Sequence, residues 1–306
     1  MFDVALSTMW AVGRFPKLAD FFDAGRGLGF ARFELNHAIN SAMLEGLSLD
    51  GMITSIHEPC PADPPMSVLK ERNWLISAPE EENRRQGVAA IRRSIDLAHK
   101  LGVGVVIVHP GRVDISFDLE AALMSLYHAG RADQPEYAQA KERLVAARAV
   151  QAGTNMPSVR RSLVELAEYA ARMGVRLGLE NRFHYHEIPQ PDEMEELLSL
   201  DPGGVVGYWH DVGHAQALEH LGFGTHEEWL RRFGGPGGRI VGVHLHDVVG
   251  ITDHQAVGKG QIDWEMVGKY LPAGVLRTCE FLASNSPEEV AAGAKLLARV
   301  TDAKGV

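Results

Sequence analysis

The sequence predicts a single-domain (β/α)8 barrel, and three observations lead to this prediction. Its 306 residues suit one barrel, which commonly takes about 250 residues. A unit recurs in which an amphipathic helix ends at glycine and leads directly into a short apolar strand. Most of these strands finish on an acidic residue or a histidine. We therefore expect residues 1–306 to form one domain of alternating helices and parallel strands.

Three copies of the recurring unit are plain in the sequence, at residues 28–34, 101–109 and 173–180. In each copy a glycine follows the last helical turn, where a left-handed cap is common. The continuous apolar run after it suits a strand that is buried on both faces of a parallel sheet. The helices before the second and third copies carry apolar residues every three or four positions, as an amphipathic helix requires.

Eight strands are expected in all. Their residues are 4–8, 30–34, 52–57, 105–109, 175–180, 205–210, 240–245 and 276–281. Eight strands that alternate with helices favour a closed parallel barrel. An open, doubly wound sheet is the alternative, because periodicity in a sequence does not show whether a sheet closes.

One connection is longer than a barrel needs, and it runs from about residue 112 to residue 157. Its polar, alanine-rich stretch at residues 136–151 predicts an inserted helix over the barrel mouth, ahead of the fifth barrel helix. Two interpretations are open. The inserted helix could be a lid that screens the substrate, or it could be a surface decoration without a role in function.

Charge and composition favour a small-molecule partner. Lys and Arg number 30 and Asp and Glu number 40, and the resulting net charge of −10 repels nucleic acids and anionic membranes. We expect a cytoplasmic protein, because the sequence shows neither the pattern of a signal peptide nor an apolar run of about 18 residues. The two cysteines give no disulfide framework. A homo-oligomer is compatible with the sequence.

The predicted strand ends carry side chains that suit a metal. In a parallel barrel these ends converge on one mouth. The residues there are His57, His109, Glu180, Asp211, His244 and, within the eighth strand, Glu280. Carboxylate and imidazole together suit Mn, Co, Zn, Fe or Mg. Taken singly, His57 or His109 could instead be a hydrogen-bonded structural histidine, but the whole set predicts a divalent-metal site. The histidines outside this pattern are expected at the surface: His37, His99, His128, His220 and His226.

Five motifs resemble those of the xylose isomerase-like TIM-barrel superfamily and lie in that family's order. They are Val108–Gly111, Leu179–Arg182, His210–His214, Val243–Asp247 and Val257–Trp264. This superfamily includes sugar and sugar-phosphate isomerases and epimerases, as well as enzymes like endonuclease IV. The resemblance covers most of the chain, and it implies a barrel with a divalent metal at its mouth.

The ketose 3-epimerases of the superfamily supply a specific ligand set. The resemblance implies that Glu180, Asp211, His244 and Glu280 hold one metal and that the two glutamates also transfer the proton. It further implies that His214 contacts the substrate. Two positions depart from this branch, and they argue against the same keto-hexose specificity: its arginine is Gly250 here, and a further glutamate is His186.

The endonuclease IV branch implies more than one metal. Its additional ligands match His57, His109, His214 and His254. An aspartate two residues before the last of these histidines is Thr252 here, and the nearest acid, Asp253, is one place out of register. The resemblance is therefore compatible with one, two or three metals.

Three functions are weighed on these observations. In the preferred one, an isomerase or epimerase acts on a small sugar or polyhydroxylated carbonyl compound, and Glu180 and Glu280 move a proton through an enediolate that the metal stabilises. Glu34, at the end of the second strand, and Lys259 are candidate substrate contacts. The alternative is a multi-metal phosphodiesterase like endonuclease IV. The third is a barrel that binds a sugar or metal without turnover.

Overall fold

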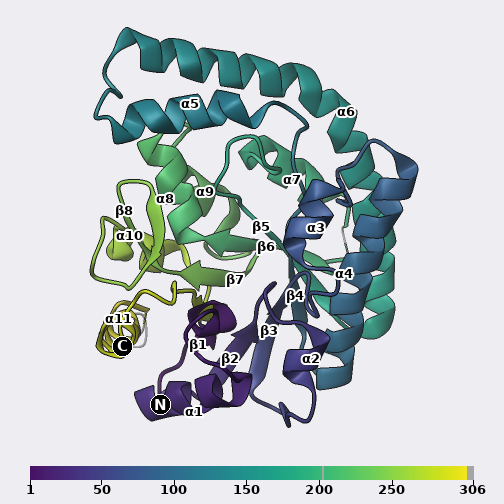
Figure 1. The fold of residues 1–306 in the computed structure, drawn as a ribbon, viewed down its shortest axis with the longest axis vertical. Coiled ribbons are helices and arrows are strands. Elements are labelled where there is room, and N and C mark those ends of the chain that lie inside the picture. The colour runs from purple at the N-terminus through teal and green to yellow at the C-terminus, as the bar shows by residue number, and fades with distance from the viewer. Residues whose placement is uncertain (202, 302–306) are drawn as a thin grey trace.

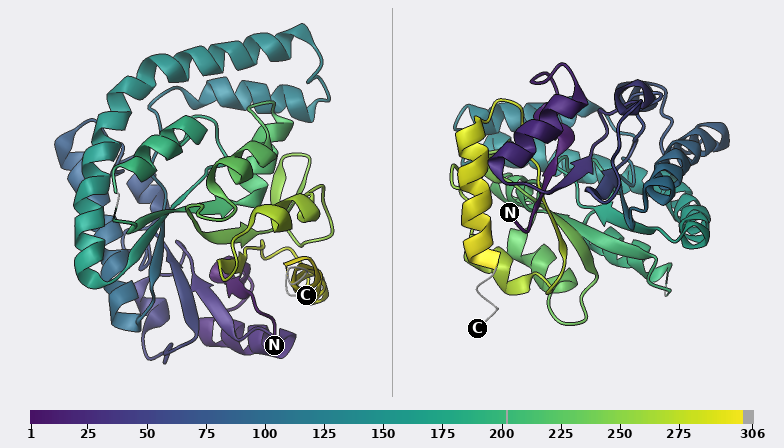
Figure 2. Two further views of the ribbon diagram at one scale, coloured as in Figure 1. Left: turned by 180° about the vertical axis from the view of Figure 1, so that it is seen from behind. Right: turned by 90° about the horizontal axis from the view of Figure 1, so that it is seen from below.

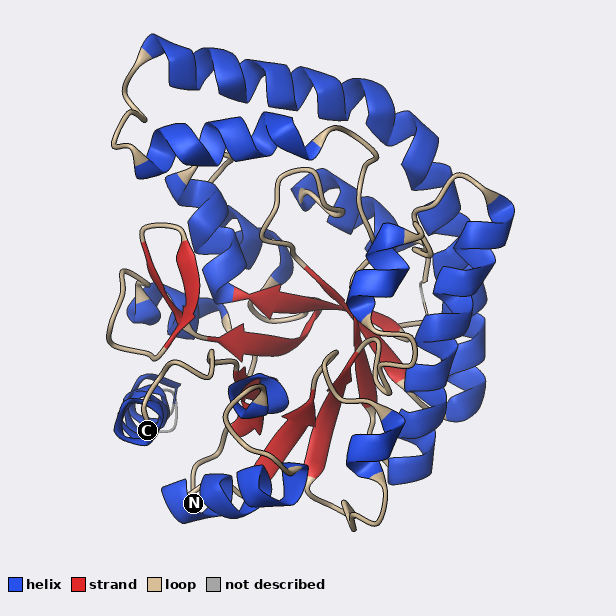
Figure 3. Cartoon of the chain, viewed as in Figure 1, coloured by secondary structure: helices blue, strands red, loops and turns tan. Residues whose placement is uncertain are grey.

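The computed structural model describes residues 1–201 and 203–301, and its central feature is a closed barrel of eight parallel strands (Figures 1 and 3). These strands are β1 (Ala5–Ser7), β2 (Arg32–Leu35), β3 (Ile53–His57), β4 (Val105–Val108), β5 (Arg176–Glu180), β6 (Val206–Asp211), β7 (Ile240–Leu245) and β10 (Leu276–Cys279). The barrel closes where Ala5 of β1 pairs with Thr278 of β10. The predicted (β/α)8 barrel is thus confirmed, and the open sheet is excluded.

Helices surround the barrel (Figure 2). In chain order they are η1 (Thr8–Ala11), α1 (Leu18–Leu28), α2 (Ser41–Leu44), α3 (Met66–Glu71), α4 (Glu81–Leu101), α5 (Phe117–His128), α6 (Pro135–Met173), α7 (Pro191–Ser199), α8 (Val212–His220), α9 (His226–Phe233), α10 (Trp264–Tyr270) and α11 (Pro287–Thr301). The glycine caps form as predicted at Gly102 and Gly174, where φ is 67° and 68°. In the two described ranges, no helix has both the length and the apolar composition that a membrane crossing requires.

Alternate residues of a strand point into the barrel, and they form an apolar layer below the polar residues at the mouth. Trp209 of β6 is buried in the same cluster as Val105 and Ile107 of β4. A Cβ atom at Gly242 of β7 would lie only 1.9 Å from the Trp209 ring, so glycine is needed for this close approach. Two residues after Trp209 comes Asp211, which therefore lies on the same side of β6 one layer nearer the mouth.

The inserted segment differs from its prediction in two ways. An additional helix, α5, precedes the predicted one, and the predicted helix is not separate from the fifth barrel helix, because α6 runs through Pro157 without a break. Proline removes one backbone N–H from the helix. Here Pro157 and Gly153, whose carbonyl loses that donor, are both exposed, so water can replace the lost hydrogen bond. Figure 1 shows that α6 bends along its length, as proline allows.

The inserted segment, α5 and the first part of α6, packs beside the barrel mouth. Helices α5 and α6 lie side by side (Figure 1), and they share a small apolar cluster that includes Leu123 and Tyr137. Tyr185, in the loop after β5, packs against this cluster, and the Tyr137 hydroxyl donates a hydrogen bond of 3.0 Å to the carbonyl of Leu221. The insert is therefore anchored to segments that follow β5 and α8, at the carboxyl-terminal side of the barrel.

Candidate metal centre

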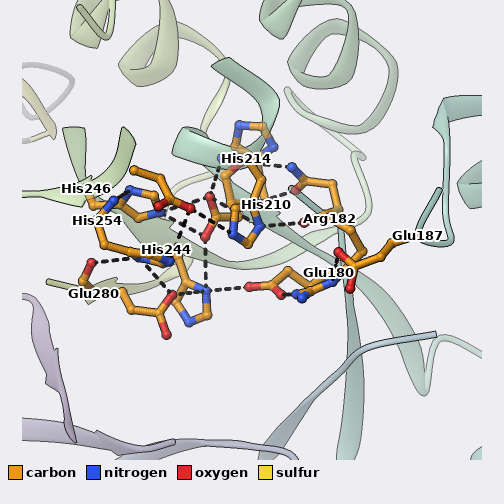
Figure 4. Close-up of polar contacts among 12 residues, drawn as sticks. Glu180, Arg182, Glu187, His210, His214, His244, His246, His254 and Glu280 are labelled. Carbon is orange, nitrogen blue, oxygen red and sulfur yellow. Dashed lines mark hydrogen bonds and ion pairs between the residues drawn. The ribbon is translucent and has the colours of Figure 1, made fainter. Parts of the chain in front are cut away.

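His244 of β7 is the point at which the predicted carboxylate ligands meet (Figure 4). Its Nδ1 atom lies 2.7 Å from Glu180 Oε1, 3.2 Å from Glu280 Oε2 and 3.6 Å from Asp211 Oδ2. All four side chains are at most 1% exposed. Glu180 and Asp211 are the last residues of β5 and β6, and Glu280 directly follows β10. The structure therefore brings together all four residues that the sequence singled out as ligands.

Glu34 of β2 contacts the His244 ring on the Nε2 side, away from the three carboxylates at Nδ1. His244 Nε2 lies 3.1 Å and 3.2 Å from the two Glu34 oxygens, and Glu34 Oε2 also accepts a hydrogen bond of 2.7 Å from the Ser55 hydroxyl. Because the Nε2 proton is directed at Glu34, the Nδ1 atom faces three carboxylates and can carry there either a second proton or a metal ion. Glu34 is completely buried, and with His57, His244 and Glu280 it also forms a group whose atoms could hold an ion.

The carboxylates of this cluster are ionised. Burial raises the pKa of Glu180, but the positive charges of Arg182 and His57 outweigh burial and hold the pKa well below 4.5. The pKa of Asp211 is likewise lowered, because the charges of His214 and His246 outweigh its burial. Burial lowers the pKa of His244, but the charges of Glu280 and Glu34 raise it well above 6.5. The cluster thus attracts positive charge, which either a proton or a metal ion can supply.

The centre contains buried atoms that make no hydrogen bond, and its donor types suit a metal. Among the described residues, Glu280 Oε1, His57 Nδ1 and His109 Nδ1 are buried and make no hydrogen bond, although Glu280 Oε1 lies 3.5 Å from His57 Nδ1. Buried polar groups are normally paired, so these oxygen and nitrogen atoms are available to coordinate an ion. Carboxylate and imidazole are ligands that first-row divalent metals accept. Glu180, Asp211, His244 and Glu280 would hold such an ion.

Two of the additional histidines lie on one side of this cluster. His57 Nε2 and His109 Nε2 are 2.5 Å apart, and they lie 3.7 Å and 2.9 Å from Glu180 Oε2. Burial and the nearby charge of Arg182 lower the pKa of His109 well below 6.5, so this ring is neutral and can offer a lone pair. Together with Glu180 they form a second group that could hold an ion.

The other two additional histidines lie on the opposite side, on a hairpin of β8 (Asp247–Val249) and β9 (Thr252–Gln255) and on α8. Asp253 Oδ2 lies 3.7 Å from His214 Nε2 and 3.4 Å from His254 Nε2. The pairing of β8 with β9 contains a register shift, and His254 has a φ of +53°. This irregular backbone places Asp253 beside both histidines although it is one position out of register in the sequence.

Two residues of the centre were not assigned a role from the sequence. Arg182 pairs with Glu180 Oε2, and His246 Nε2 lies 3.0 Å from Asp211 Oδ1. Each lies two residues beyond a predicted ligand, Glu180 or His244, and would fall on the same side of an extended chain. That spacing was the available signal.

The expectations for the remaining residues have mixed outcomes. His226 was expected at the surface but is completely buried, with its Nε2 atom 2.9 Å from His210 Nε2. His37 is partly buried, and its ring packs 5.3 Å from that of His57. His99 and His128 are exposed as expected, and His220 is partly buried. Lys259, the second candidate substrate contact, is half exposed, and its Nζ atom lies 2.9 Å from Glu289 of α11.

The insert reaches the loop after β5 through Glu120 of α5. The Glu120 carboxylate accepts hydrogen bonds from the backbone N–H groups of Tyr185 (2.9 Å) and His186 (3.4 Å), and it also contacts the rings of His184 and His186. Burial raises the pKa of Glu120, but the two histidines outweigh burial and lower it to about 2. The Glu120 carboxylate thus contacts four nitrogen atoms of the 184–186 loop, and these contacts hold the loop against the insert. His186, which replaces a glutamate of the epimerases, thus has a carboxylate partner from the insert.

Comparison with known proteins agrees with this geometry. Residues 45–300 match the xylose isomerase-like TIM barrel family. An uncharacterised protein of Methanocaldococcus jannaschii is 27% identical over 187 residues, which are 60% of this chain. The match covers 52% of that protein, so the chain spans about half the length of this relative.

Several solved structures share the fold over nearly the whole chain. A D-tagatose 3-epimerase-like protein is 18% identical, with all of both chains covered and a TM-score of 0.67. The IolI protein, solved with a zinc atom, is 15% identical, with 99% of both chains covered and a TM-score of 0.67. D-psicose 3-epimerase from Clostridium cellulolyticum H10, solved with D-tagatose, is 13% identical, with 98% of this chain and 99% of that one covered and a TM-score of 0.64. At these identities the similarity shows a common fold.

Proposed function

Because the chain belongs to the xylose isomerase-like TIM barrel family, we propose that it is a divalent-metal-dependent isomerase or epimerase of a small sugar or related polyhydroxylated carbonyl compound. The observation that carries this proposal is the meeting of three ionised carboxylates at the Nδ1 atom of His244. The solved D-tagatose 3-epimerase-like protein and D-psicose 3-epimerase support it by their shared fold.

The proposed resident ion is Mn, Co, Zn, Fe or Mg, held by Glu180, Asp211, His244 and Glu280. When bound, it would polarise the oxygen atoms of the substrate and stabilise the negative charge that develops next to the carbonyl carbon. Glu34 keeps the His244 ring in the tautomer that leaves Nδ1 free for the ion. His214 is proposed to orient a substrate hydroxyl beside the centre.

The two glutamates are proposed to move the proton. In the barrel, β5 and β10 are separated by β6 and β7, so Glu180 and Glu280 reach the centre from different directions. Glu280 Oε1 accepts no hydrogen bond among the described residues and has the His57 Nδ1 atom 3.5 Å away, so this oxygen is open to a substrate proton. Glu180 is closely surrounded by His244, His109 and Arg182, which stabilise its ionised form. We assign proton removal to Glu280 and proton return on the other face to Glu180.

A multi-metal phosphodiesterase is the second candidate, and one observation favours it. The groups formed by His57, His109 and Glu180 and by His214, Asp253 and His254 could each hold a further ion beside the first. Several ions held close together suit the displacement at a phosphodiester. The net charge of −10 argues against a nucleic-acid substrate for such an enzyme.

The experiment that distinguishes the two functions measures products and bound metal on the same preparation. Protein loaded with Mn, Co, Zn, Fe or Mg is incubated with a panel of ketoses and aldoses, and the sugars are separated by chromatography. We expect interconversion of at least one pair, its loss on chelation and its recovery on adding metal back. Hydrolysis of bis-p-nitrophenyl phosphate by a protein with three bound ions, without any sugar interconversion, would contradict the proposal.

A further inference from the structure

A cavity of about 320 Å³ lies between the insert and the loop after β5. Helix α5 provides one wall with Phe117 and Ala121, and the loop provides the opposite one with His184 and Glu187. Lys70 of α3 and Arg112 also line it. Its volume falls in the range of about 300–1,000 Å³ that is usual for binding sites of small molecules. None of the lining residues is among the proposed metal ligands.

One arginine connects this cavity with the metal centre. Arg182 pairs with Glu180 Oε2, and its Nε atom lies 3.4 Å from Glu187 Oε2. Figure 4 shows Glu187 on the far side of Arg182 from His244. A molecule in the cavity is therefore separated from Glu180 by the ion pair of Glu187 and Arg182. An elongated ligand with one end at the metal centre and the other in the cavity would pass beside this ion pair.

The walls combine an exposed aromatic face with polar groups whose charges are balanced. Phe117 is 52% exposed, and its ring lies against that of His186 (4.9 Å between centroids) and beneath the Arg112 guanidinium (5.0 Å). Lys70 Nζ lies 3.5 Å from Glu187, and Arg112 Nε lies 3.7 Å from Asp114. Since both cations already have acidic partners, the cavity is not built to bind an anion.

This composition suits a neutral ring that carries hydroxyl groups. The apolar face of such a ring can cover Phe117, while the lysine, arginine, histidine and carboxylate groups exchange hydrogen bonds with its hydroxyls. The cavity is also held in shape before any ligand binds, because Glu120 fixes the 184–186 loop to α5. A preformed cavity spends little free energy on ordering when a ligand enters.

We propose that the cavity is a second sugar subsite and that the substrate is an extended carbohydrate, in which a glycosyl unit is attached to the sugar that reacts at the metal centre. This inference rests on the proposed function for the position of the reacting end. It assigns Phe117 as the platform for the distal ring. It also gives the insert a role in substrate specificity, which differs from both earlier interpretations, a lid and a surface decoration.

Binding tests the subsite without requiring turnover. The metal-loaded full-length protein is titrated with cellobiose, maltose, glucose and glucose 6-phosphate, and saturation-transfer NMR gives each Kd. We expect a disaccharide to bind about tenfold more tightly than glucose, and Phe117→Ala to remove that advantage, which corresponds to one aromatic contact. Ala121→Trp, which fills the cavity, should give the same result, and thermal unfolding checks that both variants are folded. Val150→Ala, at an 84% exposed position of α6, is the matched control.

The outcomes separate this inference from the proposed function. The protein could bind a disaccharide in a way that depends on Phe117 and yet interconvert no sugar. That result would support the subsite and contradict the proposed function. Equal affinities for glucose and the disaccharides in wild type and in both variants would overturn the subsite. Preferential binding of glucose 6-phosphate that is lost in Ala121→Trp would also overturn it, because the cavity would then be a phosphate site.

Discussion

The Nε2 atom of His244 lies within 3.2 Å of both carboxylate oxygens of Glu34, on the side of the ring away from the three proposed metal-binding carboxylates. Hydrogen bonds of this kind fix the tautomer of a metal-binding histidine and raise its basicity. The sequence suggested Glu34 as a substrate contact, whereas its burial and its contact with His244 support a positioning role. This relationship leads to the first prediction.

Replacing Glu34 with Ala should weaken metal binding by about 10- to 100-fold, because the His244 ring loses the partner that orients it. Competition with a chromogenic chelator measures the dissociation constant. Glu289→Ala, which removes an exposed carboxylate paired with Lys259, is the control and should leave metal affinity unchanged. An unchanged affinity in Glu34→Ala would show that Glu34 does not position the ligand.

The ligands themselves give a second prediction. Asp211→Ala or His244→Ala should lower the bound metal well below the wild-type content after mild chelation, since each removes a donor that its neighbours cannot replace. Elemental analysis of the purified proteins measures this. His99→Ala, which alters an exposed histidine, should retain the wild-type content. Wild-type metal content in both site variants would refute the assignment of the centre.

A third prediction concerns the number of ions. His57 and His109 are not required as ligands in the one-metal centre but would hold a further ion in a multi-metal one. The double variant His57→Ala/His109→Ala should therefore keep close to one equivalent of metal. A wild-type content near three equivalents, with two lost in the double variant, would favour the hydrolase instead.

The regular part of the fold could be predicted because it depends on local patterns. Glycine caps, apolar strands and the acid or histidine at or just beyond most strand ends are visible in the local sequence, and they located the residues that meet at His244. The insert was harder to predict. Pro157 is a strong signal against a continuous helix, because a proline inside a helix removes a backbone hydrogen bond. Here Pro157 and Gly153 are both exposed, so water can replace that hydrogen bond, and the proline destabilises the helix less than it would at a buried position.

Long-range partners set the limit of prediction at the site. Asp253 was out of register in the sequence, and only the irregular pairing of β8 with β9 brings it to His214 and His254. His226 follows a turn on the chain and has no periodic signal of its own, so its burial against His210 could not be predicted. The pairing of Glu120 with His184 and His186 joins residues more than 60 positions apart. No local pattern encodes such a contact.

The buried histidine pair gives a fourth prediction, on stability. Burial lowers the pKa of His226 from 6.5 to about 4, so the unfolded chain binds more protons than the folded one between these pH values. The contribution of His226 to the free energy of unfolding of the metal-free protein should therefore be complete above pH 6.5 and shrink by about 3 kcal/mol as the pH drops to 4.

Urea unfolding at a series of pH values measures this dependence. Relative to wild type, His226→Gln should lose stability at pH 7.5 and show a shallower decline between pH 6.5 and 4. His99→Gln should keep the wild-type profile, because His99 is exposed. Identical pH profiles for His226→Gln and wild type would show that the buried ring does not titrate as described.

The fifth prediction tests the central claim, that Glu280 and Glu180 move a proton on a substrate held at the metal centre. The metal-loaded protein is incubated in D2O with ketoses, aldoses, inositol-like ketones and their glycosides, and NMR follows the carbon next to the carbonyl. We predict that solvent deuterium enters that carbon, and that Glu280→Gln abolishes the exchange when rates are compared per equivalent of bound metal. No deuterium incorporation across the panel, together with phosphodiesterase activity that depends on Glu180, would contradict the account.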